Sequence, residues 1–169
     1  DLHSCTHSFP TRRSSDLQRI SQTRYLATLC HGMGIDCPRI SLIHCSEHID
    51  ERHFPHTGGY ADIIERGRQG EFGPCIIDGP LDLKTSMCPE SLAVKGIDSP
   101  VGGDADALVF PDIEAANVFH KTITLLASAR IAAVLQGPDV PVVMPSRGDD
   151  ADSKYYSLAL AALQSLKNA

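Results

Sequence analysis

The sequence lacks several features that would assign it to a class at once. It has no tryptophan, its aromatic content is 5%, and no apolar run reaches the ~20 residues that a membrane-spanning helix needs. It has no run of basic residues, its net charge is −6, and nothing in it resembles a secretory signal peptide. We therefore expect neither a nucleic-acid partner nor a membrane partner.

The cysteines also lack a pattern. Six are present, at positions 5, 30, 37, 45, 75 and 88, and none forms a CxxC pair. Most lie in or beside apolar stretches, which predicts buried free thiols in a reduced, cytoplasmic protein. Histidines accompany them between residues 30 and 56, but no ligand pair has finger-like spacing. A zinc site there is the less favoured alternative, and no metal ligand is predicted.

The start of the chain differs in character from the rest. Residues 9–17 resemble a translated sequencing adapter over nine positions. We therefore treat residues 1–17 as a non-native segment, outside the functional interpretation, and expect it to bury little apolar surface. The 3–7 stretch, whose histidines and cysteine could otherwise bind a metal, is excluded with it.

Periodicity in the remaining 18–169 predicts alternating helices and strands. Apolar residues at helical spacing predict helices at 19–31, 60–68, 91–95, 113–127 and about 152–167. Short apolar runs predict strands at 39–43, 74–77, 107–110, 131–135 and 140–144. Asp78-Gly79-Pro80 has turn composition. This order predicts an α/β fold with α/β/α layers around a mainly parallel sheet.

Polar residues follow several of the predicted strands. Asp78, Asp112 and Ser146 each come directly after one, where ligands of such sheets tend to bind. The most informative stretch, Ser146-Arg147-Gly148-Asp149-Asp150, lies between a predicted strand and the last predicted helix. It combines a hydroxyl, a guanidinium and carboxylates at a place where backbone N–H groups point outward. Such a group of residues suits an anion and a proton transfer.

Five blocks of sequence, in order, resemble the phosphate acetyl/butyryltransferase family, nearest its phosphate butyryltransferase branch. They are residues 77–81, 95–100, 103–108, 110–118 and 145–149. The resemblance implies a fold similar to isocitrate/isopropylmalate dehydrogenases, with two α/β domains and a cleft between them. It further implies that 18–169 is the C-terminal part of a phosphate acyltransferase domain. Residues from about 133 to 169 would return to a first domain that the chain mostly lacks.

The resemblance implies exchange of an acyl group between CoA and phosphate, with acyl-CoA and phosphate as substrates and no cofactor. The chemistry needs a base for the CoA thiol, fixed positive charge for phosphate, and hydrogen bonds that orient the reactants. The resemblance implies that Ser146 orients the CoA thiol or the acyl carbonyl by a hydrogen bond. It also implies that Arg147 binds phosphate and that a following aspartate is the base. Asp152 is favoured, but Asp149 and Asp150 stay open, since either could instead cap the last helix.

Other residues of the blocks are candidates for binding substrate. They are Asp78, Gly79, Asp104, Asn117 and Asp149. Each has a structural alternative: a turn for the first three, a solvated helix face for Asn117, and a helix cap for Asp149. The resemblance also implies a homo-oligomer at full length.

Three functional interpretations remain at this point. The favoured one is a phosphate acyltransferase acting on short chains such as butyryl, because the acetyl branch's extra arginine has no counterpart near Thr124 and Leu125. The second is a non-catalytic acyl-CoA-sensing module, against which Ser146 and Arg147 argue. The third is a metal- and NAD-dependent decarboxylating dehydrogenase, whose Gly-Asp-x-x-Ser/Thr-Asp metal motif the sequence lacks.

Overall fold

The computed structural model describes residues 15–167, which form a mixed α/β fold around a three-stranded parallel sheet. The strands are β1 (Arg39–Ile43), β2 (Ile76–Leu81) and β3 (Ala107–Val109), in the order β2-β1-β3. The helices before β3 are α1 (Asp16–Gly32), the 3-10 turn η1 (Pro55–Thr57), α2 (Gly58–Arg68), α3 (Leu83–Met87) and α4 (Pro89–Lys95). The fold class predicted from the sequence is therefore confirmed.

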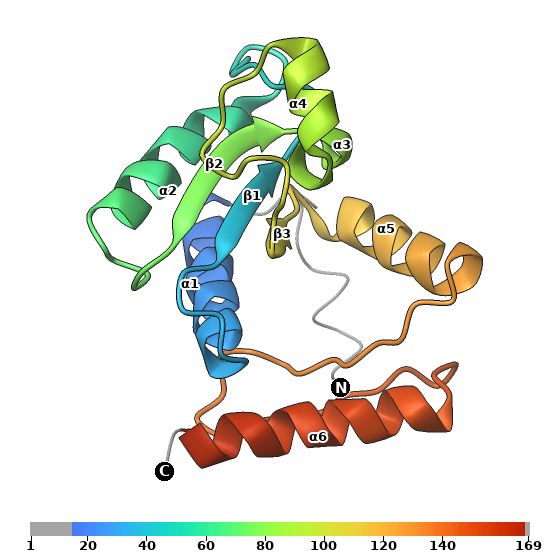
Figure 1. The fold of residues 1–169 in the computed structure, drawn as a ribbon. Helices are drawn as coiled ribbons and strands as arrows, with labels where there is room; N and C mark the ends of the chain where they lie inside the picture. The colour runs from blue at the N-terminus through green and yellow to red at the C-terminus, as the bar shows by residue number, and fades with distance from the viewer. Residues whose placement is uncertain (1–14, 168–169) are drawn as a thin grey trace.

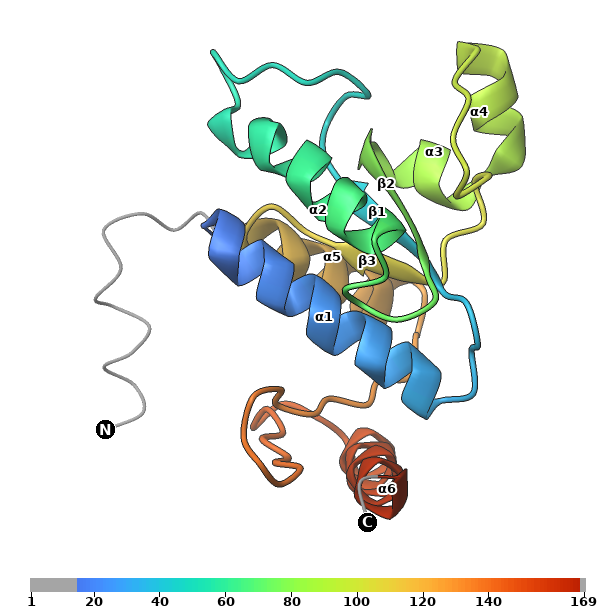
Figure 2. The ribbon, with the colours of Figure 1, turned by 90° about the vertical axis from the view of Figure 1, so that its left-hand side faces the viewer.

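Apolar residues on both faces of the sheet hold these layers together. α1 and α2 cover one face and α3 and α4 lie on the other side (Figures 1 and 2). The central strand β1 is almost entirely enclosed, with Ile40 and Leu42 fully buried. A parallel strand covered on both faces is a near-continuous apolar run, as β1 is. Tyr60 of α2 donates from its hydroxyl to the Ile43 carbonyl at 2.8 Å and thereby fixes α2 to the end of β1.

β2 differs from its prediction. The expected turn at residues 78–80 is wrong, because the strand continues through these residues to Leu81. Its Gly79 packs closely on β1: a Cβ added there would lie 2.6 Å from the carbonyl oxygen of Leu42. The Gly-Pro composition here allows a close approach between two strands rather than a change of direction.

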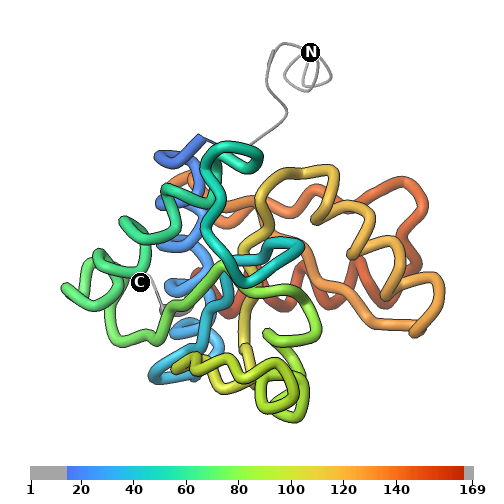
Figure 3. Tube along the Cα trace, turned by 90° about the horizontal axis from the view of Figure 1, so that it is seen from above, coloured from blue at the N-terminus to red at the C-terminus, as the bar shows by residue number. Residues whose placement is uncertain are grey.

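The second half of the chain leaves the sheet. α5 (Ile113–Leu126) follows β3, has no buried residue, and projects on the side opposite to α2 (Figure 3). α6 (Ala151–Lys167) lies below α1 in Figure 1. The strands predicted at 131–135 and 140–144 are wrong: these segments are irregular and share a single antiparallel bridge, Leu135 with Val142.

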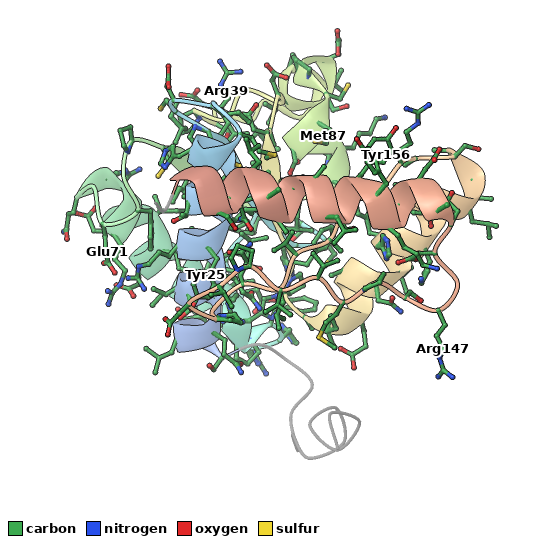
Figure 4. The ribbon with its side chains drawn as sticks, turned by 90° about the horizontal axis from the view of Figure 1, so that it is seen from below. Tyr25, Arg39, Glu71, Met87, Arg147 and Tyr156 are labelled. Carbon is green, nitrogen blue, oxygen red and sulfur yellow. The ribbon has the colours of Figure 1, made fainter. Side chains whose placement is uncertain are left out.

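Polar contacts attach α6 to the segment before it. Ser157 accepts a hydrogen bond from the Ala133 N–H at 2.9 Å, and Tyr156 accepts one from Arg130 at 3.0 Å. Figure 4 shows α6 from below, with Tyr156 labelled beside it. Ser157 is 3% exposed, whereas Ala133 is exposed, so the contact between them is partly buried.

The region treated as non-native falls mostly outside the described residues. Only its last three positions belong to them, and Ser15 caps α1 through a reciprocal pair of hydrogen bonds with Gln18. Leu17 is 76% exposed. The expectation for residues 1–14, including burial of Phe9, lies outside what the structure describes and stays a prediction.

Candidate active site

A tight turn precedes α6 and contains Ser146 and Arg147, two of the three residues predicted to react. The Asp149 carboxylate accepts a hydrogen bond from the Ser146 N–H at 2.7 Å, and the Asp149 N–H donates back to the Ser146 carbonyl at 3.1 Å. The Gly148 N–H approaches the Ser146 hydroxyl oxygen at 3.4 Å. Asp149 therefore shapes the turn, and the capping alternative considered for it does not describe its contact.

The next carboxylate caps the helix. Asp150 accepts a hydrogen bond from the Ser153 N–H at 2.7 Å, which is the contact of a helix N-cap. That backbone hydrogen bond lowers the pKa of Asp150. Asp152 lies one residue inside α6 and is exposed, and its carboxylate makes no hydrogen bond or ion pair within residues 15–167. Of the three aspartates, Asp152 alone has a carboxylate without a structural contact in the described chain.

Arg147 stands at the tip of this turn. Figure 4 shows its side chain pointing away from the rest of the molecule. It is exposed, and its guanidinium makes no hydrogen bond or ion pair to the described part of the chain. A planar guanidinium held at such a position can bind two oxygens of a phosphate at once.

The other predicted binding residues are not brought to this turn. Asp78 lies inside β2, paired in register with Ser41, and Gly79 packs against β1. Asp104 accepts a hydrogen bond from Arg39 at 2.7 Å, at the amino end of β1. Asn117 is exposed on α5.

Sequence reasoning missed a polar network at the carboxyl end of the sheet. Asp82 follows β2 directly, caps α3 through the Thr85 N–H at 2.6 Å, and accepts a hydrogen bond from Lys95 at 2.7 Å. Glu47 also accepts from Lys95, at 2.7 Å. Partial burial alone would raise the pKa of Asp82, but the contacts with Lys95 and Thr85 lower it to about 2. Only the position of Asp82 after a strand could have signalled this network.

It also missed an apolar cavity between α1, β3 and α5. The cavity has a volume of about 320 Å³ and includes Tyr25, Leu29, Phe110 and Ala116 in its lining. These residues lie as many as 91 positions apart, from 25 to 116, so no local pattern links them. The helical stripe on α1 and the apolar start of α5 were the only signals.

Two further features concern metals and membranes. Among residues 15–167, no three His, Cys, Asp or Glu side chains are placed to share a metal ion. The prediction that the cysteines are buried is mostly wrong, because Cys30 is buried but Cys37 and Cys45 are exposed. None of the described helices has the length and apolar content to cross a bilayer.

The parallel sheet with helices on both sides defines an α/β protein, and its last helix follows the Ser146-Arg147 turn. Residues 10–162 match the family model described as phosphate acetyl/butaryl transferase. The chain is 36% identical over 146 residues to phosphate acetyltransferase of Thermotoga maritima, covering 86% of this chain and 49% of that protein. It is 34% identical over 150 residues to phosphate butyryltransferase of Clostridium beijerinckii, covering 89% and 49%. The chain belongs to the phosphate acetyl/butyryltransferase family.

Solved structures agree with this assignment. A branched-chain phosphotransacylase from Enterococcus faecalis superposes with a TM-score of 0.80 at 26% identity, over 93% of this chain and 57% of that one. The EutD phosphotransacetylase from Staphylococcus aureus superposes with a TM-score of 0.77 at 21% identity, which shows the fold alone. The chain spans about half the length of the curated relatives that it matches.

Proposed function

We propose that this chain is part of a phosphate acyltransferase that exchanges a short acyl group between CoA and phosphate. The observation that carries the proposal is the Ser146-Arg147 turn in a member of this family, with an exposed guanidinium and, in the described chain, a contact-free carboxylate nearby. The relatives carry both acetyl- and butyryltransferase names. Preference for butyryl rests on Thr124 and Leu125, where the sequence lacks the acetyl branch's arginine.

Three residues carry the proposed chemistry. Arg147 binds the phosphate and offsets the charge that develops on it during transfer. The Ser146 hydroxyl orients the CoA thiol or the acyl carbonyl by a hydrogen bond. Asp152 takes the thiol proton, because Asp149 and Asp150 already accept hydrogen bonds from backbone N–H groups. The reaction needs no redox cofactor or metal in this proposal.

The other predicted substrate residues have a smaller part. Asp78 and Gly79 lie in the strand packing, and Asp104 pairs with Arg39. Asn117 presents an exposed polar group on α5, and we keep it as a contact for substrate. We therefore assign the chemistry to the turn before α6, and a structural role in the sheet or at its amino end to Asp78, Gly79 and Asp104.

The C-terminal region completes the proposal. Residues from about 133 to 169 would pack on the part of the family fold that this chain does not span. Exposed apolar residues support this, since Leu158 of α6 is 63% exposed and Met144 is 55% exposed. The five described cysteines are free, which suits a reduced cytoplasmic protein. Assembly into a homo-oligomer at full length is part of the same proposal.

The test follows release of the CoA thiol from butyryl-CoA and acetyl-CoA in the presence of phosphate. It uses the chain both as it is and extended upstream to the length of its relatives. We expect phosphate-dependent release by the extended chain, with a higher kcat/KM for butyryl-CoA. Binding of acyl-CoA without turnover on any short chain would contradict the proposal. Faster turnover of acetyl-CoA would contradict only the butyryl preference.

A matched pair of variants tests the base. Asp152→Asn removes the proposed base, and we expect kcat to fall by about 10²-fold, the lower end for general base catalysis. Asp150→Asn keeps a side-chain oxygen that can cap α6, so kcat should change little. The reverse ranking would assign the base to Asp150.

A further inference from the structure

A histidine pair and a cysteine meet at the carboxyl end of β1, outside the residues of the proposed acyl transfer. His44 follows the last residue of β1 and is only 6% exposed, whereas the next residue, Cys45, is exposed. The Cys45 Sγ lies 3.6 Å from His44 Nε2. The other ring nitrogen, Nδ1, lies 3.3 Å from Nε2 of His56. One imidazole therefore connects an exposed thiol to a second imidazole.

The ring nitrogens can act as donors or acceptors, so the two contacts fit two proton arrangements, and the one with a thiol donor activates Cys45. If the Cys45 thiol donates to His44 Nε2, neutral His44 carries its proton on Nδ1 and donates to His56 Nε2. Transfer of the thiol proton to Nε2 then converts His44 to an imidazolium, whose Nδ1–H already donates a hydrogen bond to His56. A nucleophile, a base within reach and a third group that orients the base are the features of an activated nucleophile.

The surroundings keep the base in place and in its neutral form. The Phe54 ring packs edge-on against the His44 ring, with centroids 4.7 Å apart, and His56 of η1 packs edge-on against it as well, at 5.0 Å. Burial lowers the pKa of His44, and the charge of Asp50 opposes this effect. Asp50 itself is paired with His53 at 2.8 Å. A neutral imidazole is the form that can accept a thiol proton.

We propose that Cys45 is a nucleophilic thiol, with His44 as its base and His56 as the positioning residue, and that it exchanges with low-molecular-weight disulfides. The thiol proton passes to His44 Nε2, and the thiolate attacks one sulfur of R–S–S–R. The Cys45–S–S–R bond forms as the original S–S bond breaks, and the leaving thiolate recovers the proton from His44. The disulfide supplies the oxidation level, so no other oxidant is needed. Exchange requires only a thiolate, a base and access, whereas attack on an acyl group would also need donors for an oxyanion.

The chain contains its own controls. Cys37 is also exposed, but it makes no hydrogen bond to a histidine in the described residues. Cys88 instead donates to the Glu90 carboxylate at 3.2 Å, and a neighbouring negative charge disfavours a thiolate. Cys30 is 1% exposed and reports unfolding if it becomes accessible. We therefore expect Cys45 to react first, Cys37 more slowly, and Cys88 and Cys30 last.

The test measures mixed-disulfide formation with cystamine at pH 7 for each cysteine by peptide mass spectrometry, with iodoacetamide as a second probe. We expect Cys45 to react about tenfold or more faster than Cys37, a modest share of what a positioned base supplies. His44→Gln should bring Cys45 to the rate of Cys37, with Cys30 still protected and Cys37 unchanged. His56→Gln should lower the Cys45 rate to an intermediate value.

Two results would overturn the proposal. One is equal reaction rates of Cys45 and Cys37 in the unmodified chain. The other is a fast Cys45 that His44→Gln leaves unaffected while Cys30 stays protected. If His44→Gln exposes Cys30, the His56→Gln chain decides instead, and an unchanged Cys45 rate there counts against the proposal. None of these measurements depends on acyl transfer activity, so the proposed function can fail independently.

Discussion

Removal of the Arg147 guanidinium should separate catalysis from stability. The side chain is exposed at the tip of the turn before α6, and its guanidinium makes no hydrogen bond or ion pair to the described part of the chain. The turn itself is held by Asp149 and by backbone groups. Arg147→Ala should therefore leave the fold intact, with a change in unfolding free energy within about 0.5 kcal/mol, as for surface positions without structural contacts.

The effect on catalysis should be much larger. Loss of one preorganised electrostatic stabiliser costs about 10²-fold or more in rate, which corresponds to about 2.7 kcal/mol of transition-state stabilisation. Arg147→Lys keeps the charge but loses the two-pronged contact with phosphate oxygens, so it should recover only part of the rate. The control is Arg68→Ala, because the Arg68 side chain is also exposed, at 70%, and has only a 3.8 Å ion pair with Glu65.

The assay measures kcat/KM for phosphate by release of the CoA thiol, in the chain extended to the length of its relatives, together with urea unfolding. We expect a loss for Arg147→Ala and none for Arg68→Ala. Near-normal turnover of Arg147→Ala would refute the role of Arg147 in binding phosphate. Failure to fold would refute the inference that this residue has no structural role, and the anion contact would then have to lie elsewhere.

Two further predictions concern the sheet. Asp82→Asn keeps a cap for α3 but loses the ion pair with Lys95, so the free energy of unfolding should fall by about 1–2 kcal/mol at pH 7. A pKa lowered from 3.8 to about 2 sets a limit of ~2.5 kcal/mol, and the effect should be smaller because Asp82 is 27% exposed. Because the pKa of Asp82 is lower in the folded state, its contribution is present above the unfolded value of 3.8 and is lost as pH falls to about 2. Urea unfolding should therefore show the difference between the two chains shrinking over that range. Gly79→Ala should cost about 3 kcal/mol in the same assay, because its Cβ would lie 2.6 Å from the Leu42 oxygen and β1 would have to move; an unchanged midpoint would contradict this packing.

The central part of the fold was predictable because it depends on local patterns. The prediction for β1 matches the observed Arg39–Ile43, since a run of β-branched and apolar residues suits a strand buried on both faces. The predicted helix 113–127 is close to α5, whose start Asp112 caps through the Ala115 N–H at 2.8 Å. The turn predicted at 78–80 failed because Gly-Pro composition cannot distinguish a turn from a close strand contact.

The strands predicted at 131–135 and 140–144 failed for a different reason. Their composition suits strands, but a strand forms only where a neighbour offers its backbone groups. In the described chain the two segments pair only with each other, through the Leu135–Val142 bridge, and Pro141 removes one donor. The two segments thus have the composition of strands, but no strand of the described chain pairs with them. The proposed packing of this region on the rest of the family fold would supply the missing partner.

The candidate site divides in the same way between local and distant contacts. Ser146, Arg147 and Asp149 lie within four positions of sequence, so their grouping could be predicted from the residues alone, and the turn places Ser146 and Asp149 in direct contact. The role of Asp104 could not, because its partner Arg39 lies 65 residues away.

Strand direction explains why the distant contacts fall where they do. In a parallel sheet the residues just before β3 lie beside the amino end of β1, and the residues just after β1 lie at the carboxyl end of the strands. Arg39 and Asp104 thereby pair at the amino end of β1, while His44 and Cys45 lie at the carboxyl end of the strands, where ligands of α/β folds bind. Strand direction places the proposed nucleophilic thiol at this end of the sheet, and the burial of His44 places a base beside it.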